Sequence, residues 1–223
     1  MRPALVIFDC DGVLVDSEPL AAQEFSAALH ELGLPWDPAT IDARFRGRRL
    51  SDCLTVVETA LGGPLPGTFA DELEDRTRRR FERDLVAVDG VREAIDQIRD
   101  ALRLPVCVAS SSAPGQIRSS LALTGLADCF GDALFSGTEV PNGKPAPDLF
   151  LHAARSMGAA PEACVVIEDS AAGVTGALAA HMEVLAYRAP PAASHPRRRD
   201  FDRMDALPGL LVAGTRRASA ADC

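Results

Sequence analysis

Residues 4–13, Ala4-Leu5-Val6-Ile7-Phe8-Asp9-Cys10-Asp11-Gly12-Val13, join a short apolar run to a pair of acids. The run from Ala4 to Phe8 is continuous and contains β-branched residues, which is typical of a strand buried on both faces of a parallel sheet. The run stops at Asp9, and Gly12 permits a tight turn soon afterwards. The segment therefore predicts a buried strand whose carboxyl end leads Asp9 and Asp11 into a loop.

Two further apolar runs repeat this arrangement. Residues 106–109 end at Ser110-Ser111-Ser112, and residues 164–167 end at Glu168-Asp169-Ser170. Helical patterns follow at residues 114–123 and 171–180, and a weaker strand is predicted at residues 183–187. Strands that alternate with helices indicate an α/β fold with a parallel sheet, similar to a Rossmann core. Because open α/β sheets bind ligands at the carboxyl ends of their strands, we expect the three polar strand ends to meet in space.

Residues 17–88 interrupt this alternation of strands and helices. Helical patterns fill the segment, at residues 19–32, 38–45, 50–61 and 68–85, and stretches with Gly and Pro separate them. A helix is also predicted at residues 91–102, before the second strand. We therefore expect a helical cap domain over residues 17–88, inserted after the first strand into a core of residues 1–16 and 89–223. The end of the chain around Thr215–Ser219 is expected to be poorly ordered.

The composition limits the classes of partner. The chain has 223 residues, a formal net charge of −9 and a pI near 4.9. An acidic surface repels nucleic acid and anionic lipid, so we expect no nucleic acid and no membrane as partners. The apolar run before Asp9 is too short for a signal peptide or a membrane span, and the six cysteines lack the spacing of a zinc site. We expect a cytoplasmic protein that is a monomer or a weak homodimer.

The acidic residues at two strand ends suggest a metal centre. Asp9 and Asp11 flank one residue, so their side chains project to the same side, and a hard cation such as Mg²⁺ would offset their repulsion. Asp9 could then attack phosphorus as a nucleophile, and Asp11 could act as general acid and base. An ordinary acidic turn is the alternative. Glu168 and Asp169 would supply further metal oxygens; alternatively they cap the following helix, a role that Ser170 could fill alone.

Two further groups could bind an anion. Ser110 ends a strand just before a helix, where a hydroxyl and the helix N-terminal amides form a phosphate cradle; alternatively the serines cap that helix. Lys144 lies in the loop Asn142-Gly143-Lys144-Pro145 and is the single lysine among 23 lysine and arginine residues. A solvated surface lysine is the ordinary interpretation. Its retention among so many arginines favours a site that needs a compact point charge.

In order and spacing these groups resemble the motifs of the haloacid dehalogenase superfamily. The resemblance rests on Asp9-Cys10-Asp11-Gly12-Val13, Ser110, Lys144 and Glu168-Asp169, and it covers about residues 4–190. It implies a Rossmann-like core with a helical cap. It also implies Mg²⁺ held by Asp9, Asp169 and the backbone carbonyl of Asp11, with Glu168 in direct or water-mediated contact. Ser110 and Lys144 would bind the phosphoryl group, and Ser111 is a further candidate for binding the substrate.

Within the superfamily the chain resembles the β-phosphoglucomutase and sugar-phosphatase branch, and Arg44–Leu50 resembles a cap segment of sugar-phosphate and phosphogluconate phosphatases. Mutases of that branch carry a cap histidine where Ala21 stands here, so hydrolysis is favoured over phosphomutase action. Arg46 and the neighbouring arginines could bind a second anionic group of the substrate, or they could belong to a solvated loop. We therefore expect a Mg²⁺-dependent phosphatase for a sugar phosphate or phosphorylated sugar acid. The alternatives are a phosphomutase and a phospho-metabolite-binding protein without turnover.

Overall fold

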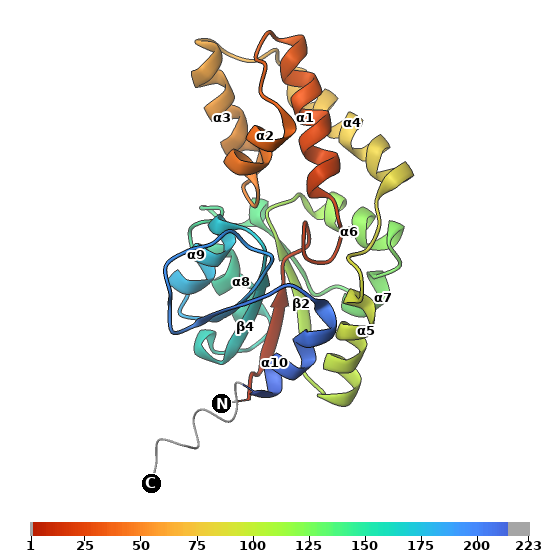
Figure 1. The fold of residues 1–223 in the computed structure, drawn as a ribbon, viewed down its shortest axis with the longest axis vertical. Coiled ribbons are helices and arrows are strands. Elements are labelled where there is room, and N and C mark those ends of the chain that lie inside the picture. The colour runs from red at the N-terminus through yellow and green to blue at the C-terminus, as the bar shows by residue number, and fades with distance from the viewer. Residues whose placement is uncertain (1, 214–223) are drawn as a thin grey trace.

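The computed structural model describes residues 2–213, and these form a fold around one parallel sheet (Figure 1). The predicted tail segment Thr215–Ser219 lies outside the described residues. The six strands have the order β3-β2-β1-β4-β5-β6, and all neighbouring pairs are parallel. The strands are β1 (Leu5–Phe8), β2 (Val106–Ser110), β3 (Leu134–Ser136), β4 (Cys164–Glu168), β5 (Glu183–Tyr187) and β6 (Arg198–Phe201). The first strand therefore lies at the centre, between β2 and β4.

Helices cover both faces of the sheet, as Figure 1 shows. Val6 and Phe8 of β1 belong to an apolar cluster with α5 (Val91–Asp96), α6 (Pro114–Leu123), α7 (Ala127–Phe130) and α10 (Leu207–Ala213). Leu5 and Ile7 belong to the opposite cluster, with α8 (Asp148–Ser156) and α9 (Ala171–Ala179). Because both faces of β1 are buried, its apolar run is continuous. Among the described residues, every helix falls short of the length and apolar character needed to cross a membrane.

Four helices stand together at the carboxyl ends of the strands (Figure 1). They are α1 (Glu18–Glu31), α2 (Pro38–Phe45), α3 (Leu50–Leu61) and α4 (Phe69–Asp84). They share an apolar cluster of their own, in which the rings of Phe25 and Phe45 stack with centroids 5.5 Å apart. Phe81, near the end of α4, packs instead with the core of the sheet. The predicted fold class, a Rossmann-like core with helices inserted after the first strand, is confirmed.

The unpredicted elements include two strands, the short helices α7 and α10, and one helical irregularity. The third strand has three residues, too few to form a recognisable apolar run, and β6 is an edge strand with the charged sequence Arg198-Arg199-Asp200-Phe201. Edge strands have no neighbour on one side and need no apolar run. The helix expected at residues 91–102 is α5 followed by a π-helical turn over Gln97–Ala101.

Candidate active site

The three polar strand ends meet, as the sequence predicts. Asp9 directly follows β1, while Ser110 and Glu168 are the last residues of β2 and β4, the two neighbours of β1. The backbone N–H of Asp9 donates to the carbonyl of Ile167 at 3.0 Å, so the ladder between β1 and β4 continues up to the first acid. The catalytic candidates are therefore fixed by the rigid central strands rather than by loop conformation alone.

Lys144 lies at the centre of the site. Its side chain is fully buried, and its ammonium Nζ donates to Oδ1 of Asp9 and Oε1 of Glu168, both at 2.8 Å. Burial opposes the charge of a lysine, but these two carboxylates outweigh it and raise the pKa of Lys144 above its ordinary value. Lys144 therefore stays protonated, and it is not the solvated surface lysine of the alternative interpretation.

Glu168 anchors both Lys144 and the start of α9. Its Oε2 accepts from the backbone N–H groups of Asp169 at 2.8 Å and Ser170 at 3.0 Å, and the Ser170 hydroxyl approaches both of its oxygens. Ser170 also caps α9 by accepting from the N–H of Gly173 at 2.9 Å. A Cβ at position 173 would lie 1.7 Å from Oε1 of Glu168, so only glycine fits there. With both oxygens already bonded, Glu168 is best placed to fix Lys144, and its predicted metal contact stays a prediction.

Asp11 is held by three hydroxyls. Ser17 donates to its Oδ1 at 2.8 Å, and Ser110 and Ser112 donate to its Oδ2 at 3.2 and 2.8 Å. Neither Ser17 nor Ser112 was singled out from the sequence as an Asp11 partner. Ser112 does not cap the following helix, because the residue at the N-cap of α6 is Ala113 and it makes no side-chain cap bond. The hydroxyls fix the orientation of Asp11, two positions after the nucleophile candidate Asp9.

The acids form a pocket that suits a hard cation. Carboxylate oxygens of Asp9, Glu168 and Asp169 lie within 4.8 Å of one another. Oδ1 of Asp169 is buried and has no hydrogen-bond partner within residues 2–213. Burial, together with the neighbouring acids, raises the pKa of Asp9 and of Asp169 well above the ordinary range, although Lys144 lowers that of Asp9. An unpaired buried carboxylate is costly, so the residues present fit Mg²⁺, which prefers carboxylate oxygens.

Gly12 makes this arrangement of acids possible. Its φ is +80°, in the left-handed region, and a Cβ there would lie 2.0 Å from Oδ2 of Asp169. Glycine is therefore required at position 12 by both its backbone conformation and its close contact with the acid.

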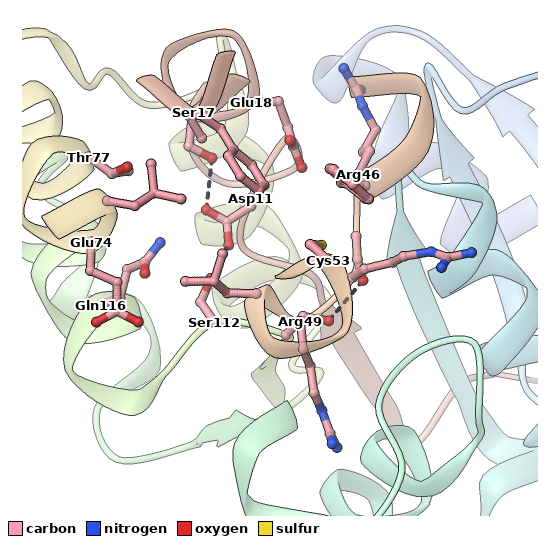
Figure 2. Close-up of a pocket in the computed structure, with 18 of the residues that line it drawn as sticks. Asp11, Ser17, Glu18, Arg46, Arg49, Cys53, Glu74, Thr77, Ser112 and Gln116 are labelled. Atoms are coloured by element: carbon pink, nitrogen blue, oxygen red, sulfur yellow. Dashed lines mark hydrogen bonds between the residues drawn. The ribbon is translucent and has the colours of Figure 1, made fainter. Parts of the chain in front are cut away.

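A cavity of about 400 Å³ separates the helical insertion from these strand ends. Asp9, Asp11, Ser110 and Ser111 line it from the core, and the apolar side chains that line it from the insertion include Ala22, Phe25, Ile41, Phe45, Leu54 and Leu73. Figure 2 shows Glu74, Thr77 and Gln116 on the wall of α4 and α6, with Ser17, Asp11 and Glu18 near the centre. The cavity thus combines an apolar surface with polar groups, which suits a small polyhydroxylated molecule.

Glu18 is a polar residue of this cavity that sequence reasoning left without a role. Burial, reinforced by the negative charge of Asp11, raises the pKa of Glu18 to about 8. It lies in Asp16-Ser17-Glu18, shortly after the first motif and within the residues that the family resemblance covers. Its position close to the first motif was the sequence feature that could have indicated a place in the site.

The arginines of the loop between α2 and α3 differ in their contacts. Arg46 bonds to Asp42 and to Asp169, and Arg49 donates to the carbonyls of Val140 and Pro141. The guanidinium of Arg44 stacks over Trp36, 4.6 Å from the ring centroid. Arg48 is exposed, and its guanidinium makes no hydrogen bond or ion pair with any described residue.

The loop also contacts the core through its backbone, because the hydroxyl of Ser111 donates to the carbonyl of Gly47 at 2.8 Å. The predicted substrate-binding residues Arg46 and Ser111 therefore both lie where the inserted helices meet the core, each with a protein partner. Their contact with a substrate stays a prediction.

Known proteins share this chain's sequence and fold. A family model described as haloacid dehalogenase-like hydrolase matches residues 3–181. The 6-phosphogluconate phosphatase of Escherichia coli K12 is 32% identical over 216 residues, covering 95% of this chain and 96% of that protein. Hexitol phosphatase B of the same strain is 31% identical over 193 residues, 86% of each chain. The crystal structure of a haloacid dehalogenase-like protein from Agrobacterium tumefaciens C58 superposes with a TM-score of 0.77 and 35% identity, covering 95% of this chain and 99% of that one. The chain therefore belongs to the haloacid dehalogenase-like hydrolases.

Proposed function

We propose that this hydrolase is a Mg²⁺-dependent phosphatase that cleaves a small phosphate monoester, either a sugar phosphate or a phosphorylated sugar acid. The observation that supports this most strongly is the buried Lys144, whose ammonium bonds to the nucleophile candidate Asp9 while Asp11 stands beside it under three hydroxyl donors. The activities of the two phosphatases to which the chain is similar agree with this substrate class. We propose residues 17–88 as the cap domain that encloses the substrate.

In the first step, a carboxylate oxygen of Asp9 attacks phosphorus, an Asp9–phosphorus bond forms, and the bond from phosphorus to the alcohol oxygen breaks. Lys144 bonds to Oδ1 of Asp9, and Oδ2 accepts no hydrogen bond from the described residues. That oxygen is therefore the one available for attack. Asp11 donates its proton to the departing alcohol, which keeps the leaving group neutral.

In the second step, water attacks the phosphorus of the aspartyl-phosphate and Asp11 accepts its proton. The bond between phosphorus and Asp9 breaks, so inorganic phosphate leaves and both carboxyl groups return to their starting states. The hydroxyls of Ser17 and Ser112 hold Asp11 in one orientation through both steps. Positioned charge and hydrogen bonds, rather than a change of chemistry, account for most of the rate in phosphoryl transfer.

Asp9, Asp169 and the backbone carbonyl of Asp11 would hold the metal ion. When bound, Mg²⁺ neutralises the carboxylates and the phosphoryl oxygens and so allows two anions to approach each other. Lys144 and Ser110 would bind the remaining phosphoryl oxygens. Glu168 acts through Lys144, because its own oxygens are bonded to that ammonium and to the start of α9.

The lining of the cavity favours hydrolysis over phosphomutase action. Ala21 lines the cavity where the mutases carry a histidine, and no histidine lines the cavity among the described residues. Without a histidine on the cap to delay the second step until a sugar has bound, water can attack the intermediate directly. The cavity therefore supports the phosphatase rather than the phosphomutase alternative.

A screen for phosphate release tests the proposal. The purified protein is incubated with sugar phosphates, phosphorylated sugar acids and nucleotides, each with Mg²⁺ and with a chelator. We expect turnover of one of the first two classes, dependence on Mg²⁺ and no activity in Asp9→Asn. Undiminished activity of Asp9→Asn, or turnover that persists in the chelator, would contradict the mechanism. Turnover confined to nucleotides would contradict the substrate class, and a complete lack of turnover would support the binding-protein alternative.

A further inference from the structure

The two oxygens of Asp169 have different surroundings. Oδ2 accepts a hydrogen bond from Nη1 of Arg46 at 3.0 Å, across 123 residues of sequence. Oδ1 is buried and has no hydrogen-bond partner within residues 2–213. The Asp169 side chain as a whole is only 2% exposed. A buried carboxylate oxygen without a donor is costly unless a cation or water satisfies it. Oδ1 is therefore the oxygen that faces a missing partner, while Arg46 holds its companion in place.

Arg46 is itself held in a fixed orientation. It follows the last residue of α2, and Asp42 lies one helical turn earlier. Nε and Nη2 of Arg46 both contact Oδ1 of Asp42, at 2.8 and 2.7 Å. The guanidinium is planar and presents its donors as a rigid fork. With two of its nitrogens fixed by Asp42, the third points at Asp169 in one direction only.

The charges along this chain of contacts largely cancel. Asp42 supplies one negative charge next to the guanidinium, so the pair of Asp42 and Arg46 is neutral and Asp169 keeps its own charge for a cation. Arg46 therefore orients the Asp169 carboxylate more than it adds net positive charge to the site. This separates Arg46 from Arg44, whose guanidinium stacks on Trp36 and forms no hydrogen bond or ion pair with the described residues of the core.

We propose that Arg46 is a positioning residue for the metal centre, which reaches from the cap, is held by Asp42, and orients Asp169 so that Oδ1 is presented to Mg²⁺. The inference rests on the proposed function, since it requires the metal site, and it gives Arg46 a role other than the predicted contact with substrate. Groups that hydrogen-bond to a metal ligand fix its orientation, and their removal typically lowers metal affinity roughly 10–100-fold.

A consequence follows for the cap. Arg46 belongs to the segment inserted after β1 and Asp169 to the core, so the contact exists only while the two parts are together. Coupling between two equilibria is reciprocal. Mg²⁺ therefore binds more tightly when the cap is closed, and bound Mg²⁺ favours closure.

The opposite role for the same contact is a counter-ion that occupies the place of the metal. In that case Arg46 competes with Mg²⁺, and its removal tightens metal binding. The structure favours orientation over competition, because the oxygen that Arg46 leaves free is the one without a partner, and because Asp42 already neutralises the guanidinium.

Titration calorimetry with Mg²⁺ alone, without any phosphate ester, tests the inference through a readout that does not depend on turnover. We expect Arg46→Met to bind Mg²⁺ roughly 10–100-fold more weakly than the unmodified protein. Arg46→Lys should lose less, since an ammonium can still reach Asp169 but cannot also fork to Asp42. Arg44→Met removes the same charge two residues away and should leave the affinity unchanged. Asp42→Asn, which loosens Arg46 without touching Asp169, should weaken binding to an intermediate extent.

Each outcome has a distinct meaning. If Arg46→Met folds with an unchanged melting temperature and binds Mg²⁺ as tightly as the unmodified protein, or more tightly, the inference is overturned while the proposed function stands. If Arg46→Met does not fold, Arg46→Lys and Asp42→Asn decide, and undiminished affinity in both overturns the inference. If the unmodified protein itself fails to bind Mg²⁺, the proposed function fails together with the inference.

Discussion

Replacing Lys144 by Met removes the cation that stands between Asp9 and Glu168. Its ammonium is 2.8 Å from an oxygen of each, and all three side chains are at most 3% exposed. Removing one member of a buried ion pair leaves an uncompensated charge and lowers the free energy of unfolding by about 3–5 kcal/mol. Because Met fills a similar volume, little of this loss should come from a cavity. We expect Lys144→Met to lose about this amount in metal-free buffer, as measured by urea unfolding.

The loss should grow as the pH rises. Burial raises the pKa of Asp9 and Lys144 lowers it, so without Lys144 the pKa of Asp9 lies higher still. Between the raised pKa of Asp9 in the unmodified protein and the still higher value in the variant, folded Asp9 of the variant keeps a proton that the unmodified protein has released, so the difference in stability grows with rising pH. Unfolding at about pH 5 and about pH 8 measures the slope.

Arg83→Met provides the matched control. Arg83 is 64% exposed and its nitrogen lies 3.9 Å from Asp84, so removal of this exposed ion pair should change the free energy of unfolding by less than about 1 kcal/mol. If Lys144→Met is as stable as Arg83→Met at both pH values, the buried ammonium does not stabilise the site, and the reasoning is refuted.

Three further predictions concern neighbours of the site. Burial raises the pKa of Glu18 to about 8, so this residue destabilises the folded state increasingly from pH 4.5 upwards. In thermal melts, Glu18→Gln should therefore gain stability over the unmodified protein by up to about 1.4 kcal/mol per pH unit towards pH 8. A parallel pH dependence of both proteins would contradict this. Gly173→Ala would place a Cβ 1.7 Å from Glu168, so phosphatase activity and melting temperature should both fall; unchanged values for both would show that the contact can relax. Ser112→Ala removes one of the three hydroxyl donors to Asp11 and should lower kcat by about tenfold, equivalent to 1.36 kcal/mol, with Mg²⁺ affinity unchanged by calorimetry; a change in affinity alone would place Ser112 in the metal site instead.

Much of the fold follows from local sequence features. The central strands are buried on both faces, so β1, β2 and β4 have continuous apolar runs that stop at polar residues. In α2, α3 and α6, the predicted bounds coincide with the helices of the structure. Residues 134–136 and 198–201 lack such a run, because one strand is very short and the other lies at the edge of the sheet.

The residues of the site also fall into a group that the sequence predicts and a group that it does not. Residues at strand ends could be grouped from the sequence, because parallel strands place their carboxyl ends along one edge. The contacts of Arg46 with Asp169 and of Ser17 with Asp11 could not be predicted, because they depend on how the inserted helices and the first loop sit on the core. The periodicity of apolar residues in the sequence does not specify how these segments are placed on the core. That Lys144 belongs to the site was suggested by its being the single lysine in the chain and by the family resemblance, whereas its burial was not predicted.

Trapping of the covalent intermediate tests the central claim most directly. During turnover with Mg²⁺ and a substrate found in the screen, the protein is quenched with borohydride, which reduces an aspartyl-phosphate to homoserine, and its peptides are mapped by mass spectrometry. We predict homoserine at position 9 and at no other aspartate. Full turnover without modification of Asp9, or modification at Asp11 or Asp169 instead, would contradict Asp9 as the nucleophile.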